Sequence, residues 1–399
     1  MTGKFSSYLK SKKKIISQLI DDLGKQYPYI SVLGTDVSGQ IISTDKSVTN
    51  VVPSGITESG FVIKVFNGQT YNELSVNDIN SKNYQEIIDD INHLTKENSS
   101  IKPVNVGILN EETLTKRFKR LNKGSDYTTD QIIGILKDYV NRTLSQSPLV
   151  VNARAMIENT EISKMFMSKN KDLEQYYTWS NPRSFVLVRR DGNTKYAYNG
   201  FGINSIEQAL NDLSLIMDST LKVAIELLDS TPPTPGVYDV ITDPSITGLI
   251  AHEAFGHGVE MDMFVKDRAK AKEYVNKQVA SPLISMHDGA ASTFSVASYF
   301  FDDDGVLAQD TQIIKDGILI NGISDALSAL QLGLKPTGNG RRESYKRKSY
   351  TRMTNTFFSS GKSSVDDMIK SIDYGFLLSQ TNNGMEDPKN WGIQCVIAY

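Results

Sequence analysis

The stretch of residues 250–260, I-A-H-E-A-F-G-H-G-V-E, constrains the fold of this chain most, because it sets two histidines five residues apart. Each residue of an α-helix turns about 100°, so side chains five residues apart point roughly 140° away from each other. The helix must therefore widen into a π-bulge with i→i+5 hydrogen bonds, or end before the second histidine. Gly256 and Gly258 flank His257 and favour such a disruption, since glycine tolerates irregular backbone.

The sequence also indicates where this helix begins. Asp243 is a suitable N-cap, Pro244 suits the first helical position, and apolar residues at 246, 249, 250 and 254 form one stripe. We predict a buried helix that begins near Pro244, carries His252 and Glu253, and unwinds near Gly256.

His252, Glu253 and His257 lie within six residues, although the whole chain has four histidines. Two imidazoles can bind zinc, and a neighbouring carboxylate can accept a proton from an attacking water. The commonest motif of this kind is H-E-x-x-H, whereas this chain has H-E-x-x-x-H. These residues predict a metal-dependent hydrolase; the alternative is a core helix with two ordinary histidines and a surface glutamate.

A catalytic zinc normally takes three protein ligands and one open position. The residues alone leave four candidates for the third ligand, without ranking them: Cys395, His287, Glu260 and Asp262. Thiolate is a good zinc ligand, and Asp288 follows His287 as a partner that could orient its ring.

Composition narrows the class of protein. A length of 399 residues is enough for two domains, and the net charge of −3 argues against a general nucleic-acid binder. No run of about 18 apolar residues predicts a membrane span, and the amphipathic first helix lacks the features of a signal peptide. The single cysteine, Cys395, excludes an internal disulfide framework. We therefore expect a cytoplasmic protein.

The order of apolar segments and turn signals predicts an α+β fold. We expect an N-terminal α/β domain with an antiparallel sheet and helices (1–231), a T-P-P-T-P-G linker, and a C-terminal β-rich domain that contains the metal helix (237–399). The acidic run D-D-D-G at 302–305 lacks the spacing of a calcium loop and is interpreted as a solvated turn between strands.

Individual elements follow from periodicity. Hairpins are expected around Asn67-Gly68 and Asp191-Gly192. Helices are expected at about 84–96, 129–144 and 205–228. Separate strands are expected at 29–33 and 40–43, joined by a Ser38-Gly39 turn, and at 150–158, 161–167, 174–179 and 185–190.

Several motifs resemble those of the TldD/PmbA (TldD/TldE) peptidases. H-E-A-F-G-H-G-V-E-M-D, D-D-G at 303–305, G-N-G-R-R at 338–342 and R-M-T-N-T at 352–356 occur in the order of that family, across roughly 237–357. The resemblance implies a cytoplasmic zinc metallopeptidase that processes leader peptides or degrades unfolded peptides; the family has also been named a modulator of DNA gyrase. It also implies an α/β N-terminal domain and a β-rich C-terminal domain.

Because the chain keeps H-E-x-x-x-H, it looks like the metal-carrying TldD type, whose PmbA-type partner lacks the motif. The resemblance implies a dimer that encloses the site, either a homodimer or a heterodimer with a PmbA/TldE-type paralogue. It implies a peptide substrate, while the net charge and the lack of a long apolar run predict no direct nucleic-acid or membrane partner.

The resemblance also assigns the third zinc ligand. In the TldD type this is a cysteine near the C-terminus, and Cys395 in G-I-Q-C matches it. Family members continue through further strands, whereas this sequence ends four residues later. We therefore expect a truncated product or an incomplete C-terminal sheet that holds Cys395 poorly.

The expected mechanism uses zinc held by His252, His257 and Cys395, with Glu253 as general base. Arg341, Arg342 and Arg352 are candidates for binding the substrate, either its developing negative charge or a peptide carboxylate; structural pairing with acidic loops is the alternative for all three. Two other functions stay open: a non-catalytic dimer subunit of the same family, and a zinc amidohydrolase that acts on small amides.

Overall fold

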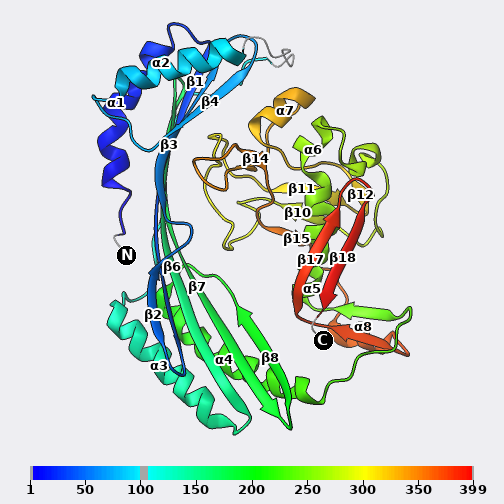
Figure 1. Cartoon of the computed structure of the whole chain (residues 1–399). Coiled ribbons are helices and arrows are strands. Elements are labelled where there is room, and N and C mark those ends of the chain that lie inside the picture. Colours follow the sequence, from blue (N-terminus) through cyan, green and yellow to red (C-terminus); the bar gives the residue numbers. More distant parts are fainter. Residues whose placement is uncertain (1–2, 99–106, 398–399) are drawn as a thin grey trace.

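The computed structural model describes residues 3–98 and 107–397, and within these ranges it does not describe the side chains of residues 381, 382 and 395–397. The architecture is α+β, as the sequence predicts, and it is dominated by one long, curved sheet (Figure 1). The strand order is β4-β3-β1-β6-β7-β5, with β2 beside β1 and β8 beside β7. Every pair in this sheet is antiparallel except β5 with β7.

The strands of this sheet are β1 (Tyr29–Asp45), β2 (Thr49–Pro53), β3 (Glu58–Phe66), β4 (Tyr71–Val76), β5 (Leu114–Arg120), β6 (Val150–Ser168), β7 (Lys171–Arg190) and β8 (Asn193–Gly200). The helices that accompany them are α1 (Ser7–Leu23), α2 (Tyr84–Glu97), α3 (Thr129–Gln146), α4 (Ile206–Glu226) and the short η2 (Leu227–Asp229).

Three predicted breaks in these strands are wrong. The strand β1 passes through Ser38 and Gly39 without a turn, and β6 and β7 each join two segments predicted as separate strands. Gly39 is there for close packing, because a Cβ atom at this position would lie 2.7 Å from Cβ of Ser54. A glycine inside a strand can thus mark a close approach of two backbones as well as a turn.

Both predicted hairpins are confirmed. The residues that flank the Asn67-Gly68 turn, Phe66 and Tyr71, are paired. At the second hairpin, Asp191 and Gly192 both have positive φ angles, 49° and 83°, as the tight turn between antiparallel strands requires.

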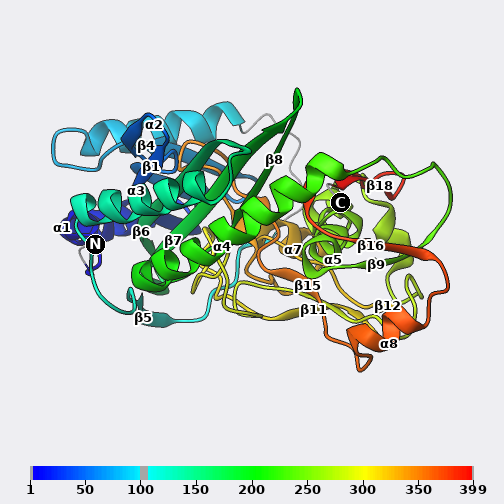
Figure 2. The ribbon, with the colours of Figure 1, turned by 90° about the horizontal axis from the view of Figure 1, so that it is seen from below.

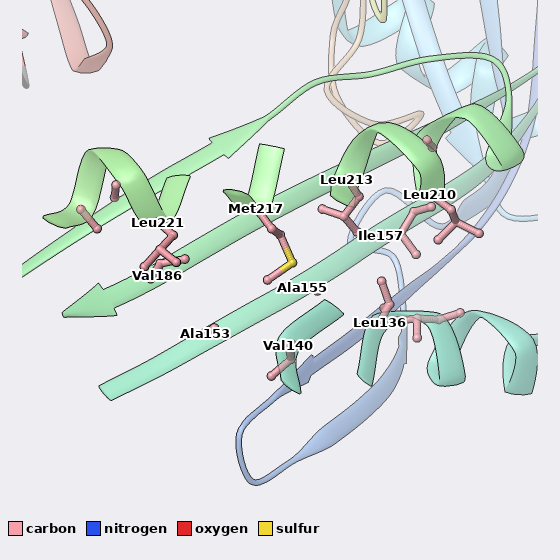
Figure 3. Packing of buried hydrophobic residues seen from close by; sticks show 14 of the residues in the cluster. Leu136, Val140, Ala153, Ala155, Ile157, Val186, Leu210, Leu213, Met217 and Leu221 are labelled. Atoms are coloured by element: carbon pink, nitrogen blue, oxygen red, sulfur yellow. The ribbon is translucent and has the colours of Figure 1, made fainter. Parts of the chain in front are cut away.

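The helices α1 to α4 cover one face of the sheet (Figure 2). Alternate residues of each strand point to this face, and those of β6 and β7 pack against α3 and α4 in one apolar cluster (Figure 3). In α4, Leu210, Leu213, Met217 and Leu221 form the buried stripe predicted from their spacing. No described helix is both long enough and apolar enough to cross a membrane.

The C-terminal region begins beyond η2 and is built from short elements. Its strands are β9 (Asp239–Thr242), β10 (Met286–Asp288), β11 (Thr311–Lys315), β12 (Ile318–Leu319), β13 (Gly340–Arg341), β14 (Tyr350–Thr351), β15 (Thr356–Phe358), β16 (Gly375–Leu378), β17 (Thr381–Asp387) and β18 (Gly392–Ile397). Its helices are α5 (Pro244–Ile250), η3 (Ala251–Gly256), η4 (His257–Val259), α6 (Met261–Val265), η5 (Lys270–Tyr274), α7 (Ala326–Leu332) and α8 (Val365–Lys370). The strands form a four-stranded sheet, β12-β11-β10-β15, and three pairs, β13-β14, β16-β9 and β17-β18.

This region packs against the second face of the large sheet. Leu33, Phe166 and Leu173 of the sheet meet Phe301 and Tyr345 of the C-terminal region in one buried cluster. The domain boundaries 1–231 and 237–399 stay a prediction. The two parts are joined by this buried cluster.

The acidic run at 302–305 lies in this contact, so its interpretation as a solvated turn is wrong. Asp302, Asp303 and Asp304 are each at most 4% exposed. Nζ of Lys64 on β3 lies 2.6 Å from Oδ1 of Asp304, and Nζ of Lys164 on β6 pairs with Asp303. Buried carboxylates need such partners, and here the partners come from strands more than 100 residues earlier in the sequence.

Candidate metal centre

The H-E-x-x-x-H motif lies on one continuous helix that changes its hydrogen-bonding period twice. It begins as α5, widens into the π-helix η3, and tightens into the 3-10 helix η4. The side chain of Asp243 caps it by accepting a hydrogen bond of 2.9 Å from the backbone N–H of Ile246. Both the predicted cap and the predicted distortion are therefore confirmed.

The π-helix brings the two histidines together. The backbone N–H of His257 donates to the carbonyl of His252, an i→i+5 hydrogen bond. The two ring centroids lie 4.8 Å apart at an interplanar angle of 83°. The extra residue per turn therefore corrects the mismatch that five-residue spacing would create on a regular α-helix.

Gly256 permits this packing, although for a different reason from the one predicted. Its φ and ψ are −66° and −65°, so its backbone is not left-handed. A Cβ atom on Gly256 would lie 1.9 Å from Sδ of Met353, which is buried against the helix. Close approach to Met353 therefore requires glycine at this position.

His252, Glu253 and His257 each offer a ligand atom, and these atoms all lie within 4.8 Å of one another. No other group of three or more His, Cys, Asp or Glu side chains with this spacing occurs among the described residues. Two imidazole nitrogens and a carboxylate oxygen are donors that suit zinc. The carboxylate of Glu253 is buried, and its Oε2 atom lacks a hydrogen-bond partner in the described part of the chain, as do Oε1 of Glu260 and Oδ1 of Asp262. Such buried, unpartnered oxygens are candidates for binding a ligand.

The surroundings shift the pKa values of these groups in different directions. Burial, with the nearby Glu386 carboxylate, raises the pKa of Glu253. Burial and the charge of His257 lower the pKa of His252, which favours the neutral imidazole that binds metal. Burial alone would lower the pKa of His257, but Glu260 outweighs it and raises the pKa.

Glu260 lies beside His257 at ion-pair distance from its ring. Oε1 of Glu260 is 3.4 Å from Nδ1 of His257, and Oε2 of Glu260 is 3.1 Å from Nη1 of Arg352. A carboxylate on one ring nitrogen leaves the other nitrogen free to bind a metal, as is usual for metal-binding histidines. Glu260, one of the four candidate third ligands, therefore occupies an orienting position.

Two further candidates for the third metal ligand, His287 and Asp262, form ion pairs with other residues. Nδ1 of His287 lies 2.9 Å from Oδ1 of Asp310. Asp262 pairs with Lys266 at 2.8 Å. The expectation that Asp288 orients the ring of His287 is wrong: Asp288 is buried and accepts hydrogen bonds from Asn339 and Thr354, so it joins two of the family motifs.

The hairpin β17-β18 lies across the motif. The indole N–H of Trp391, in the turn of this hairpin, donates a 2.7 Å hydrogen bond to the carbonyl of Ala254 inside the π-helix. On β17, a Cβ atom at Gly384 would lie 2.5 Å from Oε1 of Glu253, so the strand touches the catalytic candidate directly. Trp391 and Gly384 carry no signal in the sequence that marks them as part of the site, because their role depends on their position in the fold.

Cys395 lies on β18, and its backbone pairs with that of Gly384. Its side chain lies outside the described residues. The strand register nevertheless places this position beside the residue that contacts Glu253.

The three candidate arginines have different surroundings. Arg341 is exposed and donates a 2.7 Å hydrogen bond to the carbonyl of Met353. Arg352 is half-exposed and pairs with Glu260. Arg342 has a side chain only 3% exposed and makes two hydrogen bonds, of 2.9 and 2.6 Å, to the carboxylate of Glu73 on β4. Arg342 therefore has the structural pairing that was the alternative to substrate binding.

Comparison with known proteins supports the same family. The model of the PmbA/TldA metallopeptidase C-terminal domain matches residues 235–399. The chain is 30% identical over 292 residues to a metalloprotease TldD homolog of Buchnera aphidicola, a match that covers 70% of this chain and 60% of that protein. It is 28% identical over 221 residues to a zinc metalloprotease TldD homolog of Saccharolobus solfataricus, covering 55% of this chain and 49% of that protein.

The fold has a solved counterpart. TldE from Thermococcus kodakarensis superposes with a TM-score of 0.72 at 16% identity, over 94% of this chain and 84% of that chain. The chain spans about three fifths of the length of the Buchnera relative. The family model and the homologous sequences agree, and the solved fold is the same: this chain belongs to the TldD/PmbA family.

Proposed function

We propose that this protein is a zinc-dependent peptidase of the TldD type that hydrolyses peptide bonds in unstructured or leader peptides. The observation that carries the proposal is the convergence of His252, Glu253 and His257, with ligand atoms within 4.8 Å of one another on a π-helix. Zinc, when bound, would supply a Lewis acid that activates water and polarises a carbonyl group.

We assign the metal ligands to His252, His257 and Cys395. Glu260 supports the assignment of His257, since it occupies Nδ1 and leaves the other ring nitrogen available. The pairing of Cys395 with Gly384 supports the third ligand, because Gly384 lies against Glu253.

Glu253 would act as the general base. Its buried carboxylate has an unpartnered oxygen, which can accept a proton from the attacking water and then deliver it to the leaving amine. Among the three arginines, Arg341 is the best candidate for contacting substrate, because it is an exposed residue with no carboxylate ion-pair partner among the described residues, and its Nη1 donates to the carbonyl of Met353 at 2.7 Å. Arg352 would act mainly through Glu260, and Arg342 through Glu73.

We propose a dimer in the cytoplasm as the working form, with a PmbA/TldE-type paralogue as partner or with a second copy of this chain. Similarity to the fold of TldE supports a paralogous partner, since paired subunits of one family share a fold. The substrate would be an extended peptide that adds a strand to an exposed sheet edge.

The decisive experiment measures zinc content and peptide cleavage on the same preparations. Glu253→Gln should keep stoichiometric zinc while cleavage falls by a factor on the order of 10² to 10⁴, as for the loss of a general base. Cys395→Ser should lower zinc affinity by more than the roughly 10- to 100-fold typical of outer residues. Glu226→Gln, on the exposed end of α4, is the matched control and should change neither quantity.

Three other results of this experiment would each contradict part of the proposal. Cleavage by Glu253→Gln at the wild-type rate would exclude this role for Glu253. A wild-type protein that binds no zinc, alone or with its partner, would point to a non-catalytic subunit. Chelator-sensitive hydrolysis of small amides without cleavage of unstructured peptides would point to an amidohydrolase.

A further inference from the structure

A groove of about 710 Å³ lies beside the candidate metal centre, and its lining is almost entirely cationic. We call it the basic groove. It is lined by Arg341, Arg342, Glu343, Lys346, Arg347, Lys348, Tyr350 and Arg352. Its volume lies within the roughly 300–1,000 Å³ of ordinary ligand sites.

Most of the positive charge in this groove is not neutralised by the protein. Arg342 pairs with Glu73, and Arg352 pairs with Glu260. The other four cations are exposed, and none forms an ion pair with a carboxylate of the described residues; they are Arg341, Lys346, Arg347 and Lys348. The chain as a whole has a net charge of −3, so this concentration of positive charge is a local feature.

Tyr350 gathers three cations around one ring. Nζ of Lys266 and the guanidinium carbon of Arg352 each lie 5.5 Å from the ring centroid, and Nζ of Lys348 lies 5.8 Å from it. The face of an aromatic ring attracts each cation, but the cations repel one another. Lys266 and Arg352 are paired with Asp262 and Glu260, so Lys348 is the cation of this group left without a carboxylate partner among the described residues.

The basic groove connects to the metal-binding motif by two contacts. Arg352 pairs with Glu260, which in turn contacts Nδ1 of His257. Arg341 donates to the carbonyl of Met353, whose side chain packs against Gly256 of the π-helix. Two buried residues, Glu260 and Met353, therefore lie between the basic groove and the motif helix, each in contact with both.

We propose that the basic groove binds an acidic segment of the peptide substrate next to the bond that is cut. This rests on the proposed peptidase function and adds a substrate class to it: unstructured peptides with several Asp or Glu residues on one side of the scissile bond. Opposite charges across such a surface favour both association rate and specificity. A peptide is favoured over a nucleic acid because the groove shares Arg352, through Glu260, with the hydrolytic motif.

Binding can be tested without turnover on the Glu253→Gln protein. Three labelled peptides of equal length would be compared by fluorescence anisotropy: one rich in Asp and Glu, one with Asn and Gln at the same positions, and one with Lys. The acidic peptide should bind at least about tenfold more tightly than the neutral one, and the difference should shrink as salt is added. Equal binding of the acidic and neutral peptides would overturn the proposal.

Variants locate the binding surface. The double variant Arg347→Glu with Lys348→Glu should weaken binding of the acidic peptide by at least about tenfold. Lys14→Glu with Lys137→Glu makes the same change of charge at exposed positions on α1 and α3, and should have little effect. Equal weakening by the two double variants, with both proteins folded by circular dichroism, would contradict a local site. A short DNA duplex that displaces the acidic peptide and binds more tightly would assign the groove to nucleic acid instead.

A separate cleavage assay with zinc-loaded wild-type protein distinguishes this proposal from the proposed function. If no peptide is cleaved but the acidic peptide binds through the basic groove, the binding proposal is supported and the peptidase function is contradicted. If the neutral peptide is bound and cleaved as well as the acidic one, the peptidase function stands and the acidic preference fails.

Discussion

The two faces of the large sheet are both buried along much of its length, but by different chemistry. On the face covered by helices, residues such as Ile157, Val186 and Leu213 form an apolar cluster. On the face covered by the C-terminal region, apolar contacts alternate with charged side chains, of which the buried Lys64 and the partly buried Lys164 are the clearest.

The difference shows what alternation along a strand can reveal. An apolar residue at every second position predicts a buried face correctly, because burial of apolar surface is favourable wherever the cover comes from. A lysine at the intervening positions suggests solvent, although Lys64 is only 5% exposed. Its burial is possible because Asp304 supplies the opposite charge from a distant loop.

The largest effect is expected at Lys64. Lys64→Ala leaves Asp304 buried without its partner, and should lower the free energy of unfolding by about 3–5 kcal/mol. Lys137→Ala at an exposed position of α3 is the control, with an expected change within about 0.5 kcal/mol. Both values follow from urea denaturation. Adding Asp304→Asn to Lys64→Ala should recover much of the loss, because the buried Asp304 charge is then removed as well. Similar losses for Lys64→Ala and its control would contradict the proposed difference between the two faces.

Acid should weaken the charged face through Glu73. Burial alone would raise the pKa of Glu73, but Lys64 and Arg342 outweigh it and lower the pKa to about 2, from an ordinary value of 4.5. Since the folded pKa is the lower one, the stabilisation is complete above pH 4.5 and is lost as the pH falls toward 2. The contribution is at most about 3 kcal/mol.

The measurement compares urea denaturation at about pH 6 and about pH 3 for the wild type, Glu73→Gln and Leu213→Ala. Glu73→Gln should lose part of the pH dependence of the wild type. Leu213→Ala, which opens a cavity on the helix-covered face, should be less stable by about 2–5 kcal/mol and should keep the wild-type pH dependence. An unchanged pH dependence in Glu73→Gln would contradict the assignment.

The smallest effects on stability are expected at two glycines of the motif helix. Gly256 packs against Met353, whereas Gly248 has free space beside it. Gly256→Ala should cost about 1–3 kcal/mol, because the new methyl group meets Met353. Gly248→Ala, with no atom within 4 Å of the new methyl group, should gain up to about 1 kcal/mol. Thermal unfolding of both variants tests this, and zinc affinity should fall in Gly256→Ala alone. A stabilising Gly256→Ala would show that Met353 moves aside without cost.

Local sequence signals predicted much of the fold and the part of the site that lies on the motif helix. The five-residue spacing and Asp243 predicted the distorted helix, and Asn67-Gly68 and Asp191-Gly192 predicted their hairpins, because each depends on neighbouring residues. The continuity of β6 was not predictable in this way. Its strand passes polar residues whose partners lie on β1 and β7, far away in the sequence.

The sequence by itself determined which side chains can do chemistry here: two histidines and a glutamate, at a spacing that a regular α-helix cannot use. Only the tertiary structure decided how they are supported. Trp391 donates to the carbonyl of Ala254 from 137 residues away, and Arg342 reaches Glu73 across 269 residues. Such contacts depend on how whole elements pack, so they leave no periodic or local pattern along the chain.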